Sequence, residues 1–331
     1  VKTLMESGIN ADILVCRTEH DISDEIKNKL ALFCNVDVDS VIQSKDASTI
    51  YDVPLMMEQE KLDKVVLRKL DISNFSSTNM ESWTEFVNRL KFPKNTVNVG
   101  LIGKYVELQD SYKSILEALV HAGSVNETKV VIHSIHSEFI DDDQIKNQIS
   151  KLDGIIVAPG FGSRGIEGKI KSIKYVRENN IPFFGICLGM QMAIIEYSRN
   201  VLNLEGSNST EMDEKTLHPV ISLMQDQKNI VNKGGTMRLG SWACDLDQGS
   251  MSYKIYNSKS ITERHRHRWE LNNDYLKVLQ DSGLKTSGIN SKTGLVEIIE
   301  LPLNDWCVGV QLHPEYNSTV ETPHPLFVSF V

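Results

Sequence analysis

Short apolar segments alternate with longer amphipathic segments through most of this chain. Four apolar segments are too short for helices and are bounded by turn residues, which predicts β-strands. They are residues 97–102, 129–135, 154–158 and 182–185. Apolar residues at helical spacing lie between them and predict helices at residues 111–122 and 168–179. This alternation is typical of an α/β fold with a doubly wound, mostly parallel sheet.

The first part of the chain carries a smaller α/β pattern of its own. Residues 11–17 have the pattern of a strand, and residues 23–34 have a helical pattern with Ser23 as a candidate N-cap. A polar stretch with one helical pattern follows and has the composition of a linker. We therefore expect three parts. They are a partial α/β unit at residues 1–72, an interdomain linker at 73–95 and the larger α/β domain at 96–331.

Charge, hydropathy and cysteine usage exclude several classes of partner. The net charge of −9 disfavours nucleic acid, because phosphate binding needs clustered positive charge. No run of 18 apolar residues is present, so no membrane partner is expected. The five cysteines form no C-x-x-C pair, which disfavours a metal site or disulfide framework and favours a reducing, cytoplasmic location. The chain begins without Met and within a helical pattern, which suggests a fragment.

One cysteine is distinguished by its neighbours. Cys187 lies between Gly185 and Gly189, after a predicted strand and before a helical pattern. A strand-to-helix turn of this kind presents a nucleophile, and the nearby helix amides favour the thiolate. A lone cysteine is more often a buried structural residue, but the two glycines favour the nucleophile.

A thiol nucleophile needs a base, and the base needs an orienting group. His313 follows an apolar strand pattern at residues 306–310, so we expect it at the same edge of the sheet as Cys187. Glu315 lies two residues further on and could hold the imidazole in one tautomer. A His-x-Glu pattern alone is weak, and an exposed pair is the alternative.

Acyl chemistry also needs donors for an oxyanion. The amide of Leu188, directly after the nucleophile, is one candidate. The loop around Gly160 offers a second, because glycine permits close backbone approach. A simple tight turn is the alternative interpretation of this loop.

Residues 185–191, with His313-Pro314-Glu315 and the loop at Gly160, resemble the class I (triad) glutamine amidotransferases. The resemblance covers about residues 96–331 and implies a flavodoxin-like sheet. It also implies hydrolysis of glutamine to glutamate and ammonia through a cysteinyl thioester. Cys187 would attack the side-chain amide carbon. His313 would protonate the leaving ammonia and then activate water, with Glu315 orienting the ring.

Three further segments narrow the resemblance to the CTP synthase family. They are residues 208–211, 234–240 and 263–270. The resemblance implies that Glu211 and Arg268 hold the ends of the substrate glutamine and that Gln191 and Gly160 line its pocket. A carboxylate suits the α-ammonium, and a guanidinium suits the α-carboxylate. Without the resemblance, residues 264–268 would be interpreted as an anion-binding patch with arginines on both faces of a strand, and Glu211 as a solvated acid.

The first 72 residues resemble the end of the amidoligase domain of the same family. This implies that Lys29 and Phe33 contact UTP or CTP and that Asp46 lies near the ATP adenine. The family resemblance further implies a homotetrameric ligase of pyrimidine biosynthesis that uses ATP and Mg²⁺, is activated by GTP, and has no cofactor in its glutaminase domain.

The chain departs from the family pattern in three places. No G-x-x-x-x-G-K-[ST] occurs, so we expect only the tail of the synthetase half and glutaminase chemistry alone. Pro159 stands where a glycine is usual, and residues 223–234 look short beside the family's GTP-linked lid loop.

Two alternatives stay open: the glutaminase of another triad amidotransferase, such as GMP synthetase, and a catalytically silent regulatory module. Glu211 and Arg268 disfavour a cysteine peptidase or a γ-glutamyl hydrolase.

Overall fold

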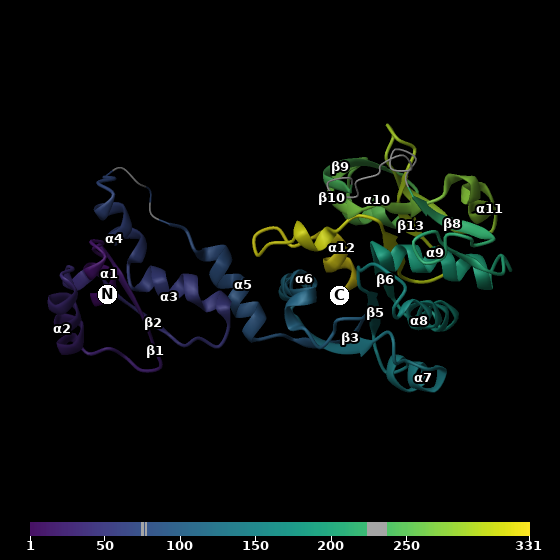
Figure 1. Cartoon of the computed structure of the whole chain (residues 1–331). Helices are drawn as coiled ribbons and strands as arrows, with labels where there is room; N and C mark the ends of the chain where they lie inside the picture. The colour runs from purple at the N-terminus through teal and green to yellow at the C-terminus, as the bar shows by residue number, and fades with distance from the viewer. Residues whose placement is uncertain (74–75, 77, 224–236) are drawn as a thin grey trace. The chain divides into compact units, whose positions relative to one another are not determined.

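The computed structural model describes residues 1–73, 76, 78–223 and 237–331 (Figure 1). The expected lid loop and residues 234–236 lie outside this described part. The chain divides into two compact units, Val1–Asn88 and Arg89–Val331, and each is described by itself. No helix of the described residues has both the length and the apolar character needed to cross a membrane.

The first unit contains a small parallel sheet with helices around it. Its two strands pair in parallel and its helices include two short 3-10 turns. The elements are α1 (Lys2–Glu6), β1 (Leu14–Thr18), α2 (Asp24–Cys34), η1 (Val38–Ser40), β2 (Val41–Lys45), η2 (Ile50–Asp52), α3 (Val53–Gln59), α4 (Leu62–Lys69) and most of α5 (Glu81–Lys91). Ser23 accepts a hydrogen bond from the amide of Ile26, which confirms it as the N-cap of α2.

A nine-stranded mixed sheet forms the centre of the second unit. The strand order is β10-β9-β12-β13-β14-β6-β5-β3-β4. Strands β14, β6, β5, β3 and β4 are parallel, which confirms the expected doubly wound core. They are β3 (Asn95–Gly103), β4 (Thr128–His136), β5 (Gly154–Val157), β6 (Phe183–Ile186) and β14 (Cys307–Val310).

The other half of this sheet is antiparallel and was not expected from the sequence pattern. Its strands continue the sheet beyond β14. They are β9 (Arg238–Leu246), β10 (Ser260–His267), β12 (Lys285–Ile289) and β13 (Val296–Glu300). A separate three-stranded sheet consists of β7 (Ser207–Ser209), β8 (His218–Leu223) and β11 (Trp269–Leu271).

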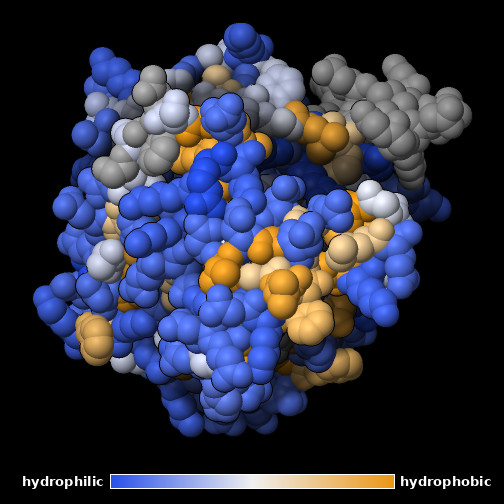
Figure 2. All heavy atoms as spheres, turned by 90° about the vertical axis from the view of Figure 1, so that its left-hand side faces the viewer, coloured by the Kyte–Doolittle hydropathy of each residue, from blue (hydrophilic) through white to orange (hydrophobic). Residues whose placement is uncertain are grey.

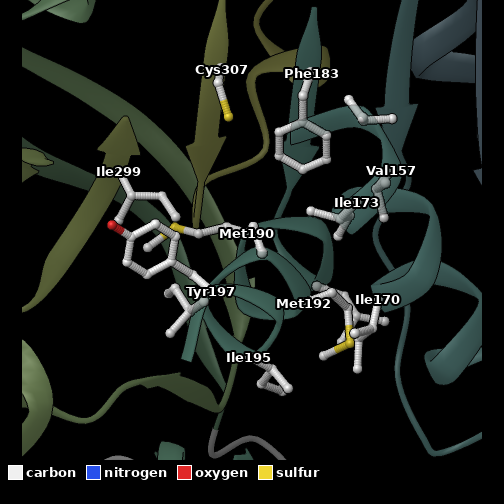
Figure 3. Close-up of a cluster of buried hydrophobic side chains, with 14 of the residues drawn as sticks. Val157, Ile170, Ile173, Phe183, Met190, Met192, Ile195, Tyr197, Ile299 and Cys307 are labelled. Atoms are coloured by element: carbon white, nitrogen blue, oxygen red, sulfur yellow. The ribbon is translucent and has the colours of Figure 1, made fainter. Parts of the chain in front are cut away.

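Helices cover both faces of the large sheet. One buried cluster includes residues of α7 (Asp142–Ile149), α8 (Ile166–Glu178) and α9 (Leu188–Asn200) (Figure 3). A second cluster includes residues of α6 (Lys113–Val125) and α12 (Pro325–Phe330). Neighbouring residues of strand β6 pack into different clusters: Phe183 belongs to the first cluster and Phe184 to the second. Apolar side chains on both faces explain why the parallel strands have nearly continuous apolar sequences.

Candidate active site

The turn at Cys187 has the geometry of a nucleophile elbow. Strand β6 ends at Ile186, helix α9 begins at Leu188, and Cys187 between them has φ 52° and ψ −100°. A non-glycine residue with positive φ is uncommon and is typical of functional turns. The turn closes only around small neighbours, because a Cβ on Gly189 would overlap the carbonyl oxygen of Val157. Close packing at this turn therefore explains why the residues that flank Cys187, Gly185 and Gly189, are glycines.

His313 and Glu315 form a buried pair after strand β14. The Nδ1 atom of His313 lies 2.7 Å from Oε1 of Glu315. A short 3-10 turn, η6 (Pro314–Tyr316), places the carboxylate beside the ring. The other ring nitrogen, Nε2, has no hydrogen-bond partner among the described residues. The alternative of an exposed pair is therefore excluded for His313 and Glu315, and the free nitrogen is available for a proton at the reaction centre.

The charge state of His313 depends on both neighbours. Burial lowers the pKa of His313, but attraction to the Cys187 sulfur and the hydrogen bond and charge of Glu315 outweigh burial and raise this pKa to about 11. We attribute the Cys187 contribution to charge, because Nε2 forms no hydrogen bond of standard geometry. The arrangement favours the protonated, imidazolium form of His313.

The loop that follows β5 packs against the start of α9. A Cβ placed on Gly160 would lie 3.3 Å from a methyl carbon of Leu188, so the loop packs against the Leu188 side chain. The loop is tied at its far end, where the amide of Gly162 donates a 2.9 Å hydrogen bond to Glu211. The Lys104 ammonium donates to the carbonyl of Phe161 in the same loop. Sequence interpretation missed Lys104, although its place directly after the end of β3 is a usable signal.

Glu211 contacts this loop and interacts with Arg268, and Gln191 is bonded to the residue that follows Arg268. Burial raises the pKa of Glu211, opposed by the hydrogen bond from Gly162 and the charges of Lys104 and Arg268. Gln191 is buried and its amide nitrogen donates to the carbonyl of Trp269 at 2.7 Å, which ties α9 to the residue after Arg268. The Glu211 carboxylate and the Arg268 guanidinium thus attract one another at the edge of the loop.

Strand β10 corrects one expectation. We expected its arginines on both faces of a strand, but Arg264 and Arg266 are both exposed while His265 and His267 are buried. Residues two apart on a strand share a face, which is the physical reason. Arg268 lies beyond the end of β10, so it can take a direction of its own.

The inward face of β10 holds a polar network with the composition of a metal site. His265 Nδ1 lies 3.0 Å from His267 Nε2, and both rings lie near Glu297. The Arg238 guanidinium lies 2.7 Å from Glu297 and so already neutralises this carboxylate. Burial, with the charges of Arg238 and His313, lowers the pKa of His265 to about 3. We therefore interpret the group as a neutral histidine pair beside an ion pair.

The three expected nucleotide residues lie in the first unit. Lys29 and Phe33 are one turn apart on α2, and the Phe33 side chain is 80% exposed. Lys29 pairs with Glu25 at 2.6 Å and Asp46 pairs with Arg17 at 2.9 Å. The molecular face in Figure 2 is mainly hydrophilic with hydrophobic patches between the polar groups. An exposed aromatic ring one turn from a lysine is accessible for a ligand contact.

Comparisons with known proteins cover both parts of the chain. A family model for class-I glutamine amidotransferases matches residues 107–331, and one for the CTP synthase N-terminus matches residues 1–72. The whole chain is 63% identical to a CTP synthase of Flavobacterium johnsoniae, covering 62% of that protein. It is 50% identical to a CTP synthase of Methanocaldococcus jannaschii, again covering 62% of that protein. The chain thus spans about three fifths of the length of these relatives.

A solved structure is similar to the second unit. It is the glutaminase domain of Trypanosoma brucei CTPS with bound acivicin, with a TM-score of 0.66 and 36% identity. The likeness covers 71% of this chain and 92% of that chain.

Proposed function

Because this chain belongs to the class-I glutamine amidotransferase family, we propose that its second unit hydrolyses glutamine to glutamate and ammonia. The observation that carries the proposal is the buried pair of His313 and Glu315, 2.7 Å apart, beside the Cys187 elbow. We assign Cys187 as the nucleophile, His313 as acid and base, and Glu315 as the group that orients His313.

The proposed reaction begins from the thiolate–imidazolium pair. The Cys187 sulfur attacks the amide carbon of glutamine, and the carbonyl oxygen becomes an oxyanion that Leu188 and the Gly160 loop would stabilise. The His313 Nε2–H then protonates the departing nitrogen, so that ammonia leaves and a thioester remains. Water next attacks the thioester carbon while His313 takes a proton from it. Collapse of this second oxyanion releases glutamate and restores the thiolate.

Substrate selection would depend on the charges beside the loop. We propose that Glu211 binds the α-ammonium of glutamine and that Arg268 binds its α-carboxylate, with Gln191 and Gly160 lining the pocket. The raised pKa of Glu211 supports this assignment, because a half-buried carboxylate gains from a cation brought by the substrate. A guanidinium offers two parallel donors, which suits a carboxylate.

We further propose that the complete protein is a CTP synthase, a ligase that uses the ammonia for ATP-dependent amination of UTP to CTP. The relatives that bear this name and the family match at residues 1–72 support the proposal. They favour it over a GMP synthetase-like glutaminase or a silent regulatory module. Lys29 and Phe33 would contact the pyrimidine nucleotide and Asp46 the adenine of ATP.

Several properties of that complete enzyme are proposals that rest on the family alone. They are the use of Mg²⁺ with ATP, activation by GTP, assembly as a homotetramer, a cytoplasmic location, and a division into parts at residues 1–72, 73–95 and 96–331. No cofactor is proposed for the glutaminase reaction, because the thiol, imidazole and carboxylate supply each proton and electron pair that it needs.

The test is release of glutamate from glutamine by the purified chain, alone and with GTP. Cys187→Ala should abolish release while the unfolding temperature changes little. Cys34→Ala is the matched control, since this thiol lies at the end of α2 in the other unit, and its activity should equal that of the unchanged chain. Glutamate release that persists in Cys187→Ala would refute the assignment of the nucleophile.

A further inference from the structure

A buried lysine lies directly beneath the loop of the candidate active site. We propose that Lys169 is a positioning residue of the glutaminase site, whose ammonium fixes the Gly160 loop and supplies positive charge near the Cys187 sulfur. The inference rests on the proposed glutaminase function for its role in turnover. Its influence on the thiol can be measured without glutamine.

Lys169 occupies an unusual position for a lysine. It is the fourth residue of α8 and is only 1% exposed. Lysine is almost never fully buried unless it has a partner. A cation near the start of a helix is also disfavoured by the helix dipole. Two unfavourable conditions at one residue indicate that another interaction retains the lysine there.

The contacts of Lys169 lead to the loop. Its Nζ atom donates a 2.8 Å hydrogen bond to the carbonyl of Ala158, the residue that follows strand β5. The same Nζ lies 3.9 Å from the position that a Cβ on Gly160 would occupy. Because a peptide unit is planar, fixing the Ala158 carbonyl also fixes the peptide that joins it to Pro159 and the direction in which the chain enters Gly160.

Lys169 completes a set of three ties on this loop. Lys104 holds the carbonyl of Phe161, and Glu211 accepts the amide of Gly162. These two ties hold the far end of the loop, whereas Lys169 holds its beginning. The Gly160 backbone lies between the ties and packs against Leu188. A loop fixed at both ends keeps its amides in place before the oxyanion forms, which is what electrostatic preorganisation requires.

The charges around Lys169 point to the nucleophile. The titratable groups that act on its ammonium are Lys104, which repels it, and Cys187, which attracts it, and no carboxylate of the described residues is among them. Burial first and Lys104 second lower the pKa of Lys169 to about 7, and Cys187 opposes this shift. The sulfur is thus the anion that favours the charged form of the lysine. By reciprocity, the ammonium attracts negative charge on the sulfur.

Lys169→Met tests the proposal, since methionine is unbranched and fills similar space without charge or hydrogen bond. We expect kcat for glutamine hydrolysis to fall roughly 10- to 100-fold with little change in KM, because the loop loses its order but the substrate's charged ends keep their partners. The matched control is Lys174→Met on the exposed side of the same helix, which should leave both constants unchanged.

A second readout excludes a merely structural role. The rate at which iodoacetamide alkylates Cys187 at pH 7, followed by mass spectrometry, should fall about tenfold in Lys169→Met, because the sulfur loses the positive charge that attracts it. The unfolding temperature should stay equal or rise, since a buried cation is removed.

The outcomes separate this proposal from the proposed function. If Lys169→Met alkylates and turns over glutamine as fast as the unchanged chain, the positioning role is refuted. If the unchanged chain hydrolyses no glutamine, the proposed function fails, and the alkylation rates still decide whether Lys169 acts on Cys187. A fall in alkylation accompanied by a large fall in unfolding temperature would also overturn the proposal, because it would indicate a structural role.

Discussion

The backbone amide of Cys187 donates a 2.6 Å hydrogen bond to the carbonyl of Val310. These residues are far apart in the chain, but strands β6 and β14 pair in parallel and align Ile186 with Val310. His313 follows Val310 by three residues, so the pairing that builds the sheet also fixes where the nucleophile and the imidazole emerge. Cys187 and His313 therefore follow two neighbouring central strands of the sheet.

Loss of the orienting carboxylate should slow the chemistry without removing the substrate site. Glu315→Gln keeps the shape of the side chain but no longer stabilises the imidazolium that Glu315 contacts at 2.7 Å. We expect kcat to fall on the order of 10³- to 10⁴-fold, as for other acyl-transfer triads that lose their acid. Steady-state kinetics of glutamate release would check this, with the exposed Glu321→Gln as control. A loss below tenfold would contradict the assigned role.

The glycines of the elbow should tolerate no side chain. In Gly189→Ala the new methyl would overlap the Val157 carbonyl oxygen, a backbone atom that cannot turn away. We expect a loss of about 2–4 kcal/mol in unfolding free energy and loss of glutaminase activity. Gly249→Ala is the control, since the nearest atom to its methyl lies 3.5 Å away. Denaturant titration of both variants measures the difference, and equal stabilities would contradict the steric argument.

The parallel half of the sheet and the elbow were predictable because each carries a local signal. Apolar runs predict β5 and β6, and two glycines around Cys187 predict a tight turn. Residues of β10 carry no such signal. Its inward side chains are Glu263, His265 and His267, which hydropathy assigns to solvent. Only the partners supplied by distant strands, such as Arg238 and Glu297, make their burial possible.

Lys169 was missed for a related reason. A lysine in a helical pattern is normally interpreted as solvent-exposed, and the sequence gives no sign that α8 turns this residue inward. Its burial follows from the loop that crosses above the helix, where the Ala158 carbonyl needs a donor. Position-specific chemistry of this kind depends on packing between segments, which a local pattern does not contain.

Arg268 should contribute to substrate binding more than to stability. Arg268→Ala removes the guanidinium proposed to bind the α-carboxylate, and a hydrogen-bonded charge of this kind is worth about 1.5–3 kcal/mol. We expect KM for glutamine to rise roughly 10- to 100-fold with a small change in unfolding temperature. Arg266→Ala, two residues earlier and exposed, is the matched control and should keep its KM. Equal effects of both substitutions would indicate a general charge effect instead.

The buried histidines of β10 should make the fold sensitive to acid. Burial, with the charges of Arg238 and His313, lowers the pKa of His265 to about 3, so the folded protein keeps this ring neutral while the unfolded chain protonates it below about pH 6.5. The unfolded state then binds the extra proton, and stability falls as pH decreases from 6.5 toward 3. For this one ring the loss reaches about 2 kcal/mol at pH 5.

His265→Asn keeps a polar group that does not titrate, so the unfolding free energy of this variant should decline less between pH 7 and pH 5 than that of the unchanged chain. Denaturant titrations at the two pH values measure this difference, with the exposed His20→Asn as control. Parallel declines in the His265→Asn protein and the unchanged chain would show that His265 is not the group that titrates.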